Sequence, residues 1–236
     1  MKFQAIIADC PWEYADQKKE RKDGAGPTRG IGACHHYNQI GTCDLGNLDV
    51  QSVTADRCHL YLWATMPLLP DAMQVMAAWG FKYSTVAFAW IKMNKKRWRD
   101  AVGDVLQTQM FGGDPVIDFL DALTFFGPGF YTGSNVELVL LGTRGQPFAH
   151  AEGHKASQIV YAPIGEHSAK PDEVQRRIEW MYPDATPRLE MFGRRARAGW
   201  TVAGNESPEC LGEDVKDSLT RLANVPGIGN RKGKGC

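Results

Sequence analysis

The sequence predicts a doubly wound α/β fold of the Rossmann-like kind, in which helices cover both faces of a sheet. Two observations support this prediction. Short apolar runs rich in β-branched and aromatic residues recur along the chain, and stretches with apolar residues at helical spacing lie between them. Such an alternation of strands and helices favours a sheet assembled from strand–helix–strand units.

Bulk composition places the chain among ordinary globular proteins. Its 236 residues suit one domain or a domain with a tail, and 43% of them are hydrophobic and 23% charged. The net charge is zero, so contact with a polyanion must come from local basic patches. We find no leader pattern and no run of about 18 apolar residues, and we therefore expect a cytoplasmic protein without membrane contact.

The six cysteines form no Cys-x-x-Cys pair, which indicates a reducing compartment rather than a disulfide framework. Cys34, His35, His36 and Cys43 lie close together in the sequence, but their spacing does not match a usual zinc site. We therefore expect no metal.

The first predicted strand, 3–8, is a short apolar run that stops at Asp9 and Pro11, which indicates a buried parallel strand with Asp9 at its carboxyl end. Residues 15–46 are rich in Gly, Lys and Asp without periodicity and predict a long loop. The next expected elements are a short helix 47–55, a strand 59–64, a helix 68–79 that stops at Gly80, and a strand 83–92.

Residues 93–126 break this alternation and start with the basic and aromatic cluster Lys95-Lys96-Arg97-Trp98-Arg99. Beyond this insert we expect strands 136–142 and 158–162, an amphipathic helix 171–182, and strands 188–192 and 200–203. The main domain therefore spans residues 1–206. Residues 207–236 are polar and end in the sequence RKGKGC, which predicts a polar, basic tail.

The most informative segment is Asp9-Cys10-Pro11-Trp12, because ligands of open α/β sheets bind at the carboxyl ends of the strands. The exocyclic amine of adenine is a poor nucleophile, since its lone pair is delocalised into the ring. A carboxylate and a neighbouring main-chain carbonyl can accept its two N–H groups, and an aromatic ring can stack on the base. The alternative to this catalytic interpretation is that the segment is a purely structural turn that buries Trp12.

Two further clusters lie in the second half of the chain. Ser168 can cap the helix predicted to follow it, and Lys170 at the helix entrance can bind a ligand carboxylate or ribose. The segment from Glu190 to Arg197, followed by Asn205-Glu206, combines a basic turn with an acid that can bind ribose hydroxyls. Taken separately, both clusters are also compatible with surface charge around loops.

In this order the clusters resemble the MT-A70-type family of adenine methyltransferases. The matching segments within residues 3–206 are Asp9-Cys10-Pro11-Trp12, Leu62-Trp63-Ala64-Thr65, Trp90-Ile91-Lys92, Leu141-Gly142-Thr143-Arg144-Gly145, His167-Ser168-Ala169-Lys170-Pro171-Asp172-Glu173, Phe192-Gly193-Arg194-Arg195 and Gly204-Asn205-Glu206. The resemblance implies methylation of the N6 amine of adenine in nucleic acid, with S-adenosylmethionine as cofactor. It also implies a methyltransferase sheet in the circularly permuted order, where the catalytic motif precedes the cofactor-binding motifs.

Carried over residue by residue, the resemblance implies a catalytic loop of Asp9, Cys10, Pro11 and Trp12, in which the carbonyl of Cys10 assists Asp9. Tyr37 would lie near the target base, and Trp63 would form a wall of the pocket. The cofactor would be held by Asp9, Lys170, Phe192, Arg194, Asn205 and Glu206, with His167, Ser168 and Arg197 as further candidates.

Two features depart from the family pattern. The family usually has proline where this chain has Cys10, a change that keeps the carbonyl but loosens φ and adds an N–H. The insert is longer than in compact bacterial members. We expect its Lys95, Lys96 and Arg97 to contact phosphate and its Trp98 to stack on a base, the alternative being a solvated loop.

DNA is the favoured substrate, because the chain is small and resembles bacterial and phage members most. RNA fits the same motif, since a flipped adenine presents the same edge in both polymers, and cytosine-N4 methylation uses similar chemistry. A non-catalytic nucleic-acid-binding scaffold is the alternative of a different class. Such members lose the catalytic acid or aromatic residue, whereas Asp9 and Trp12 are both present here. The sequence indicates no obligatory protein partner.

Overall fold

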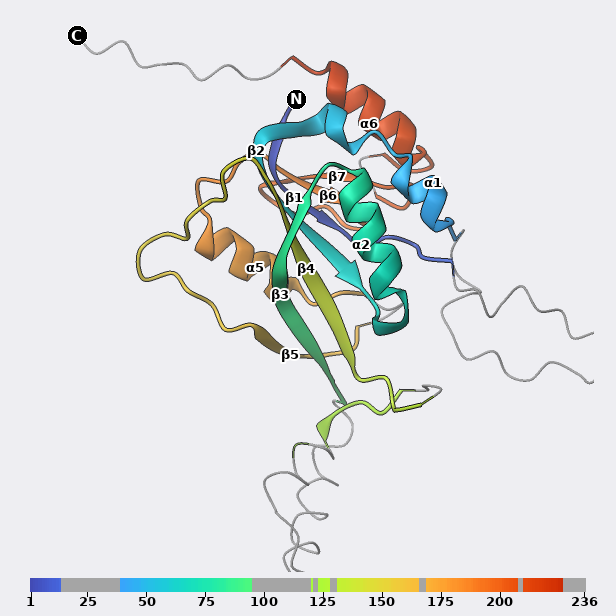
Figure 1. Ribbon diagram of the computed structural model, residues 1–236, viewed down its shortest axis with the longest axis vertical. Coiled ribbons are helices and arrows are strands. Elements are labelled where there is room, and N and C mark those ends of the chain that lie inside the picture. The colour runs from blue at the N-terminus through green and yellow to red at the C-terminus, as the bar shows by residue number, and fades with distance from the viewer. Residues whose placement is uncertain are drawn as a thin grey trace, which may run out of the picture.

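The computed structural model describes residues 1–13, 39–94, 120, 123–127, 131–165, 169–207 and 210–226. Its centre is a seven-stranded sheet with the strand order β5-β3-β4-β2-β1-β6-β7 (Figure 1). The strands are β1 (Phe3–Ala8), β2 (Thr54–Ala64), β3 (Lys82–Met93), β4 (Val136–Arg144), β5 (Ile159–Pro163), β6 (Arg188–Met191) and β7 (Trp200–Ala203).

β1 is an inner strand, the third from the β7 edge, and is parallel to both of its neighbours, β2 and β6. β7 is parallel to β6, and β5 is parallel to β3. β4 is antiparallel to β2 and β3, between which it lies. The carboxyl ends of the other strands therefore meet at one edge of the sheet, together with the amino end of β4. The predicted α/β class is confirmed, and the reversed direction of β4 is a finding that the strand pattern did not predict.

Helices lie on both faces of the sheet (Figure 1). They are α1 (Thr42–Gly46), α2 (Leu69–Ala78), α5 (Asp172–Met181) and α6 (Val215–Asn224). Along β2, Leu60 and Leu62 point into a core that includes buried residues of α1, α2 and α6. The alternate residues Tyr61 and Trp63 point into a second core that includes buried residues of α5. This period of two makes both faces of the sheet apolar, so that both faces need helices to cover them.

Several element boundaries differ from the predicted ones. The predicted helix 47–55 is wrong: a single 3-10 turn, Val50–Val53, leads directly into β2. Asp49 caps this turn by accepting the Ser52 N–H at 3.1 Å, and the buried Thr54 hydroxyl donates to the Val50 carbonyl at 2.7 Å, which ends the turn where the strand starts. The predicted loop 15–46 ends in the short helix α1.

The start of α5 also differs from the prediction. Pro171 is the N-cap, and no side-chain hydrogen bond caps the helix. The expected N-cap Ser168, with Pro171 inside the first turn, is therefore wrong, and Ser168 itself lies outside the described residues. Asp172 and Glu173 occupy the first turn, where acidic side chains complement the helix dipole. Lys170 consequently stands just before the helix.

α6 lies within the stretch expected to be a polar tail. Its residues Val215, Leu219 and Leu222 are buried in the same core as β1 and α2. The Met1 ammonium group donates to the Leu222 and Val225 carbonyls at 2.7 and 2.6 Å, at the carboxyl end of this helix. Residues 215–224 are thus part of the folded core. Among the described helices, none has the length and apolar character needed to cross a bilayer.

His59 of β2 is a buried titratable residue between the sheet and the carboxyl end of α5. Its ring is 2% exposed and forms edge contacts with Phe148 and Tyr182, at centroid distances of 5.1 and 5.0 Å. The Phe148 N–H donates to Nε2 at 3.0 Å, which requires that nitrogen to be unprotonated. Burial, with Arg57 assisting, lowers the pKa of His59 to about 4.

We predict that the free energy of unfolding falls as the pH decreases from about 6.5 to about 4. In this window the unfolded chain binds a proton at His59 that the folded chain excludes, so stability rises with pH. The contribution of this residue is on the order of 3 kcal/mol. Urea unfolding across this range tests the prediction, and His59→Gln should flatten the slope. A slope that is unchanged in the variant would contradict the assignment to His59.

Candidate active site and cofactor cleft

Asp9 stands at the carboxyl edge of the sheet, directly after the inner strand β1. The neighbours of β1 on its two sides, β2 and β6, come from different parts of the chain, which makes the end of β1 a switch point of the topology. A cleft lies here between the end of β1, the start of α5 and the turn after β6. It is lined by Ile7, Asp9, Trp63, Ala169, Lys170, Pro171, Asp172, Gln175, Glu190, Phe192, Gly193, Arg194, Arg195, Ala196 and Arg197.

Four side chains of alternating charge, Lys92, Glu137, Lys170 and Asp9, form a charged row along this edge. Lys170 Nζ lies 3.0 Å from Asp9 Oδ1 and 3.3 Å from Glu137 Oε2, and Lys92 Nζ lies 2.7 Å from Glu137 Oε1. Lys170 thereby joins β1 to β4 across the end of β2. Its ammonium group also lies 5.5 Å from the ring centroid of Trp63, a cation–π contact.

The charged row holds Lys170 and Glu137 in their ionised forms. Burial alone would lower the pKa of Lys170, but Asp9 and Glu137 outweigh it, so that the pKa is raised above the ordinary value of a lysine. Burial alone would raise the pKa of Glu137, whereas the Lys170 and Lys92 ammonium groups hold it below the ordinary value. Asp9 therefore faces a permanent cation. Its two oxygens have lone pairs for further hydrogen bonds from a ligand.

The turn after Asp9 is fixed by its backbone. The Trp12 N–H donates to the Cys10 carbonyl at 2.9 Å, and the Pro11 carbonyl accepts the Ile40 N–H at 2.9 Å. The Cys10 and Trp12 side chains are 4% and 7% exposed and belong to the main core. Burial and the Asp9 charge raise the pKa of the Cys10 thiol, which makes it unsuited as a nucleophile. A second lone pair on the Cys10 carbonyl can accept from a ligand.

Phe192 lines the cleft and has an unusual backbone conformation. Its φ is +62°, in the left-handed region that bulky residues rarely adopt. The ends of β6 and β7 approach closely here, because a Cβ atom on Gly204 would lie 2.9 Å from the Gly193 carbonyl oxygen and 3.1 Å from Phe192 Cα. The absent side chain of Gly204 thus lets the Phe192 turn lie against the loop that carries Asn205 and Glu206.

Charged and amide groups surround the rest of the cleft. Arg194 Nε lies 3.3 Å from Glu206 Oε2, which joins the turn after β6 to the loop after β7. Glu190 accepts a hydrogen bond from Gln175 Nε2 at 2.7 Å, and burial raises its pKa although this bond opposes the shift. Arg197 instead forms a two-point contact with Glu179 of α5, at 2.8 and 3.1 Å.

The structure brings together part of the residue set expected from the sequence. Asp9, Lys170, Trp63, Phe192 and Arg194 line one cleft, as does Arg197. Asn205 and Glu206 are exposed and are not among the lining residues, but Glu206 contacts Arg194, which lines the cleft. The remaining expected residues lie outside the described residues: Tyr37, Lys95, Lys96, Arg97, Trp98, His167 and Ser168, as do Cys34, His35 and His36.

Sequence reasoning missed Lys92, Glu137, Gln175 and Glu190 as site residues. Lys92 and Glu137 carry a signal in retrospect, since each is a charged residue near the end of a strongly apolar strand. That signal becomes readable only when β3 and β4 are known to be antiparallel neighbours, with Trp90 opposite Glu137. Gln175 carries no signal that distinguishes it from a surface residue of its helix. Glu190, on the inner strand β6, starts one of the clusters found in the sequence but was given no role.

The cleft suits S-adenosylmethionine by the chemistry of its groups. The cofactor combines a carboxylate, cationic ammonium and sulfonium groups, ribose hydroxyls and an aromatic base. The cations Lys170 and Arg194 can bind the carboxylate, and the acids Asp9 and Glu190 complement the cationic groups. The Phe192 ring offers an apolar wall for the base.

Comparison with known proteins agrees with this geometry. The family model described as MT-A70 matches residues 3–110 and 125–206. With the mixed sheet and the cleft at the end of β1, the match defines an S-adenosylmethionine-dependent methyltransferase that acts on nucleic acid. The chain belongs to the MT-A70 family.

Two relatives extend this comparison. Type II methyltransferase M.MunI from Mycoplasma sp is 31% identical over 216 residues, which cover 88% of this chain and 79% of that protein. The N(6)-adenosine-methyltransferase MT-A70-like protein from Arabidopsis thaliana is 25% identical over 206 residues, which cover 86% of this chain but 24% of that protein. The likeness to the plant protein thus concerns a part of its length.

We predict that Glu137→Gln destabilises the protein at pH 7 by about 3 kcal/mol, because it removes one partner of a buried ion pair. The wild-type carboxylate contributes stability above its ordinary pKa of about 4.5, and this contribution is lost as the pH falls through the lower folded pKa. Urea unfolding at pH 7 and at decreasing pH measures the effect. The stabilities of variant and wild type should converge in acid, and a gap that is independent of pH would contradict the charge-based explanation.

Proposed function

We propose that this protein methylates the exocyclic N6 amine of adenine in DNA. The observation that carries the proposal is the Asp9 carboxylate, which lies at the switch point of the sheet 3.0 Å from the Lys170 ammonium group. The next residue, Cys10, starts a turn, and its main-chain carbonyl is adjacent to Asp9 in the chain. The name of the plant relative supports the adenine amine as acceptor. The greater share of M.MunI that this chain covers supports a bacterial type of methyltransferase acting on DNA.

The chemistry of the amine determines the roles of the catalytic loop. An Asp9 oxygen and the Cys10 carbonyl accept the two N–H groups, which draws the nitrogen toward the pyramidal geometry that frees its lone pair. The cofactor supplies an electrophilic methyl group when bound. Holding the amine in line with this group lowers the barrier mainly through orientation. The Asp9 carboxylate stabilises the positive charge that develops on the nitrogen and can accept the proton that it releases.

Lys170 keeps Asp9 in place for this task. Because Lys170 also contacts Glu137, the ammonium group has a second anchor and does not depend on Asp9 alone for its position. Pro11 fixes the turn, and Trp12 packs its ring into the core behind the turn. We assign Trp63, whose ring centroid lies 5.5 Å from the Lys170 ammonium group, to the wall of the target-base pocket.

We assign the cofactor to Asp9, Lys170, Phe192, Arg194, Asn205 and Glu206. The first four line one cleft, and Glu206, next to Asn205 in the chain, contacts Arg194. The nucleic acid is assigned to Tyr37, which contacts the target base, and to the insert 93–126, where Lys95, Lys96 and Arg97 contact phosphate and Trp98 stacks on a base. Local basic residues are needed for this contact, since the net charge of the chain is zero.

Asn205→Ala and Lys170→Ala are predicted to weaken S-adenosylmethionine binding by about tenfold each, the effect of losing one strong hydrogen bond. Calorimetry on the purified protein measures the dissociation constant. Lys82→Ala is the matched control, because Lys82 is exposed at the start of β3, at the opposite edge of the sheet. Wild-type affinity in both site variants would reject the assignment.

Asp9→Ala is predicted to reduce methyl transfer by about two orders of magnitude or more, because a group that stabilises developing charge is lost. Asp9→Asn should keep weakened activity, since its amide oxygen still accepts a hydrogen bond. Cys10→Pro should be neutral or faster, because it stiffens the turn and keeps the carbonyl. The assay is methyl transfer to DNA and RNA, followed by mass spectrometry of the nucleosides, with the melting temperature as folding control.

The same assay separates the alternatives. Transfer to RNA alone would replace DNA as the substrate, and N4-methylcytosine as the product would replace adenine. If wild type transfers no methyl group to either polymer and Cys10→Pro does not restore activity, a non-catalytic scaffold takes the place of the enzyme.

A further inference from the structure

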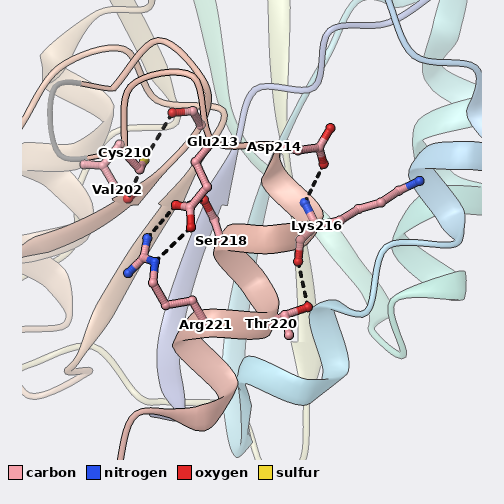
Figure 2. Close-up of polar contacts among 9 residues, drawn as sticks. Val202, Cys210, Glu213, Asp214, Lys216, Ser218, Thr220 and Arg221 are labelled. Atoms are coloured by element: carbon pink, nitrogen blue, oxygen red, sulfur yellow. Dashed lines mark hydrogen bonds and ion pairs between the residues drawn. The ribbon is translucent and has the colours of Figure 1, made fainter.

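The loop Gly204–Glu206 accepts hydrogen bonds from residues that lie beyond the family match, which ends at residue 206. The Gly212 N–H donates to the Asn205 carbonyl at 2.8 Å. The Cys210 thiol donates to the Gly204 carbonyl at 3.2 Å and lies 3.7 Å from the Val202 carbonyl oxygen (Figure 2). Both contacts act on backbone atoms, and they leave the Asn205 and Glu206 side chains facing outward.

The Cys210 contact satisfies a backbone group that has little access to water. Gly204 is buried and Cys210 is 8% exposed. A carbonyl oxygen has two lone pairs, so the thiol can add a second donor to this poorly hydrated group and favour one position of the loop over others. The Ser207 N–H also donates to the Gly204 carbonyl at 3.0 Å, which closes the turn at this point.

The segment around Cys210 is in turn fixed to α6. The Glu213 N–H donates to the Cys210 carbonyl at 2.9 Å. The Glu213 carboxylate accepts from the Ser218 hydroxyl at 2.6 Å and from Arg221 Nε and Nη2 at 3.0 and 2.7 Å, as Figure 2 shows. These hydrogen bonds, from Arg221 first and Ser218 second, lower the pKa of Glu213 to about 2, so the contact persists at neutral pH.

α6 supplies the rigid end of this connection. Asp214 caps the helix by accepting the Lys216 N–H at 2.8 Å. Val215, Leu219 and Leu222 are buried in the core that also holds β1 and α2. A continuous series of contacts therefore runs from the main core through α6, Glu213 and Cys210 to the loop with Asn205 and Glu206.

We infer that Cys210 and Glu213 are positioning residues for the cofactor, which they serve by holding the loop Gly204–Glu206 against the Phe192 turn. This inference rests on the proposed assignment of Asn205 and Glu206 to S-adenosylmethionine. Because a loop that is already ordered loses less entropy when a ligand binds, loss of the connection should weaken binding even where the protein stays folded.

The test uses full-length Cys210→Ala, Cys210→Ser and Glu213→Ala, with calorimetric titration of S-adenosylmethionine at a temperature well below every melting transition. Cys210→Ala and Glu213→Ala should each weaken binding by about three- to tenfold, the effect of one or two hydrogen bonds. Cys210→Ser should restore much of the affinity, because its hydroxyl still donates. A role in stability alone would change the melting temperature without changing the affinity of the folded protein.

Thr42→Val is the matched control for lost stability. It removes the hydrogen bond of 2.7 Å between the Thr42 hydroxyl and Asp71, which joins α1 to α2 and involves no residue of the cleft. This variant should lower the melting temperature and keep wild-type affinity. The inference is overturned if Cys210→Ala and Glu213→Ala bind as wild type does, or if Thr42→Val weakens binding as much as they do.

Asn205→Ala, titrated in the same experiment, separates this inference from the assignment beneath it. If Asn205→Ala weakens binding while Cys210→Ala and Glu213→Ala do not, the positioning role fails and the cofactor assignment stands. If Asn205→Ala binds as wild type does, the loop is not a cofactor site and the assignment itself fails.

Discussion

The pairing of buried charge at the carboxyl edge of the sheet is the constraint on which the rest of the structure depends. Lys170 must reach Asp9, directly after β1, and Glu137 on β4 at once, across the end of β2. An unpaired charge at this depth costs on the order of several kcal/mol. The start of α5, the reversed direction of β4 and the inner position of β1 are therefore not independent of one another. The carboxylate proposed for catalysis is held in position before any ligand binds.

The sequence predicted the elements whose pattern is local. β1 and β7 have the predicted boundaries, because a buried strand bounded by Asp9, or by glycines at 199 and 204, is readable within a few residues. The direction of β4 was not predictable, since it follows from pairing with β2 and β3, which are distant in the sequence. α6 was missed for a related reason. Its few apolar residues stand among charged ones and matter only because the core lies beneath them.

The candidate site shows the same difference between local sequence patterns and features that depend on distant parts of the chain. Motif residues such as Asp9, Lys170 and Phe192 were named from the sequence and line one cleft in the structure. Glu137 could not be named, because its role comes from two lysines that other elements bring to it. Trp12 shows the opposite case, as its motif position indicated contact with a base while its side chain packs in the core. Tyr37 and the basic residues of the insert lie outside the described residues and stay proposals.

The left-handed backbone of Phe192 has a consequence for how this protein can change. A phenylalanine at a φ of +62° costs on the order of 1–3 kcal/mol, a cost that glycine at the same position would not carry. Selection for thermal stability alone would therefore favour glycine at position 192, as would a design method that scores backbone fit. The aromatic wall of the cleft would be lost with that exchange. Under the proposed cofactor assignment, folding and ligand binding therefore make opposite demands on this one residue.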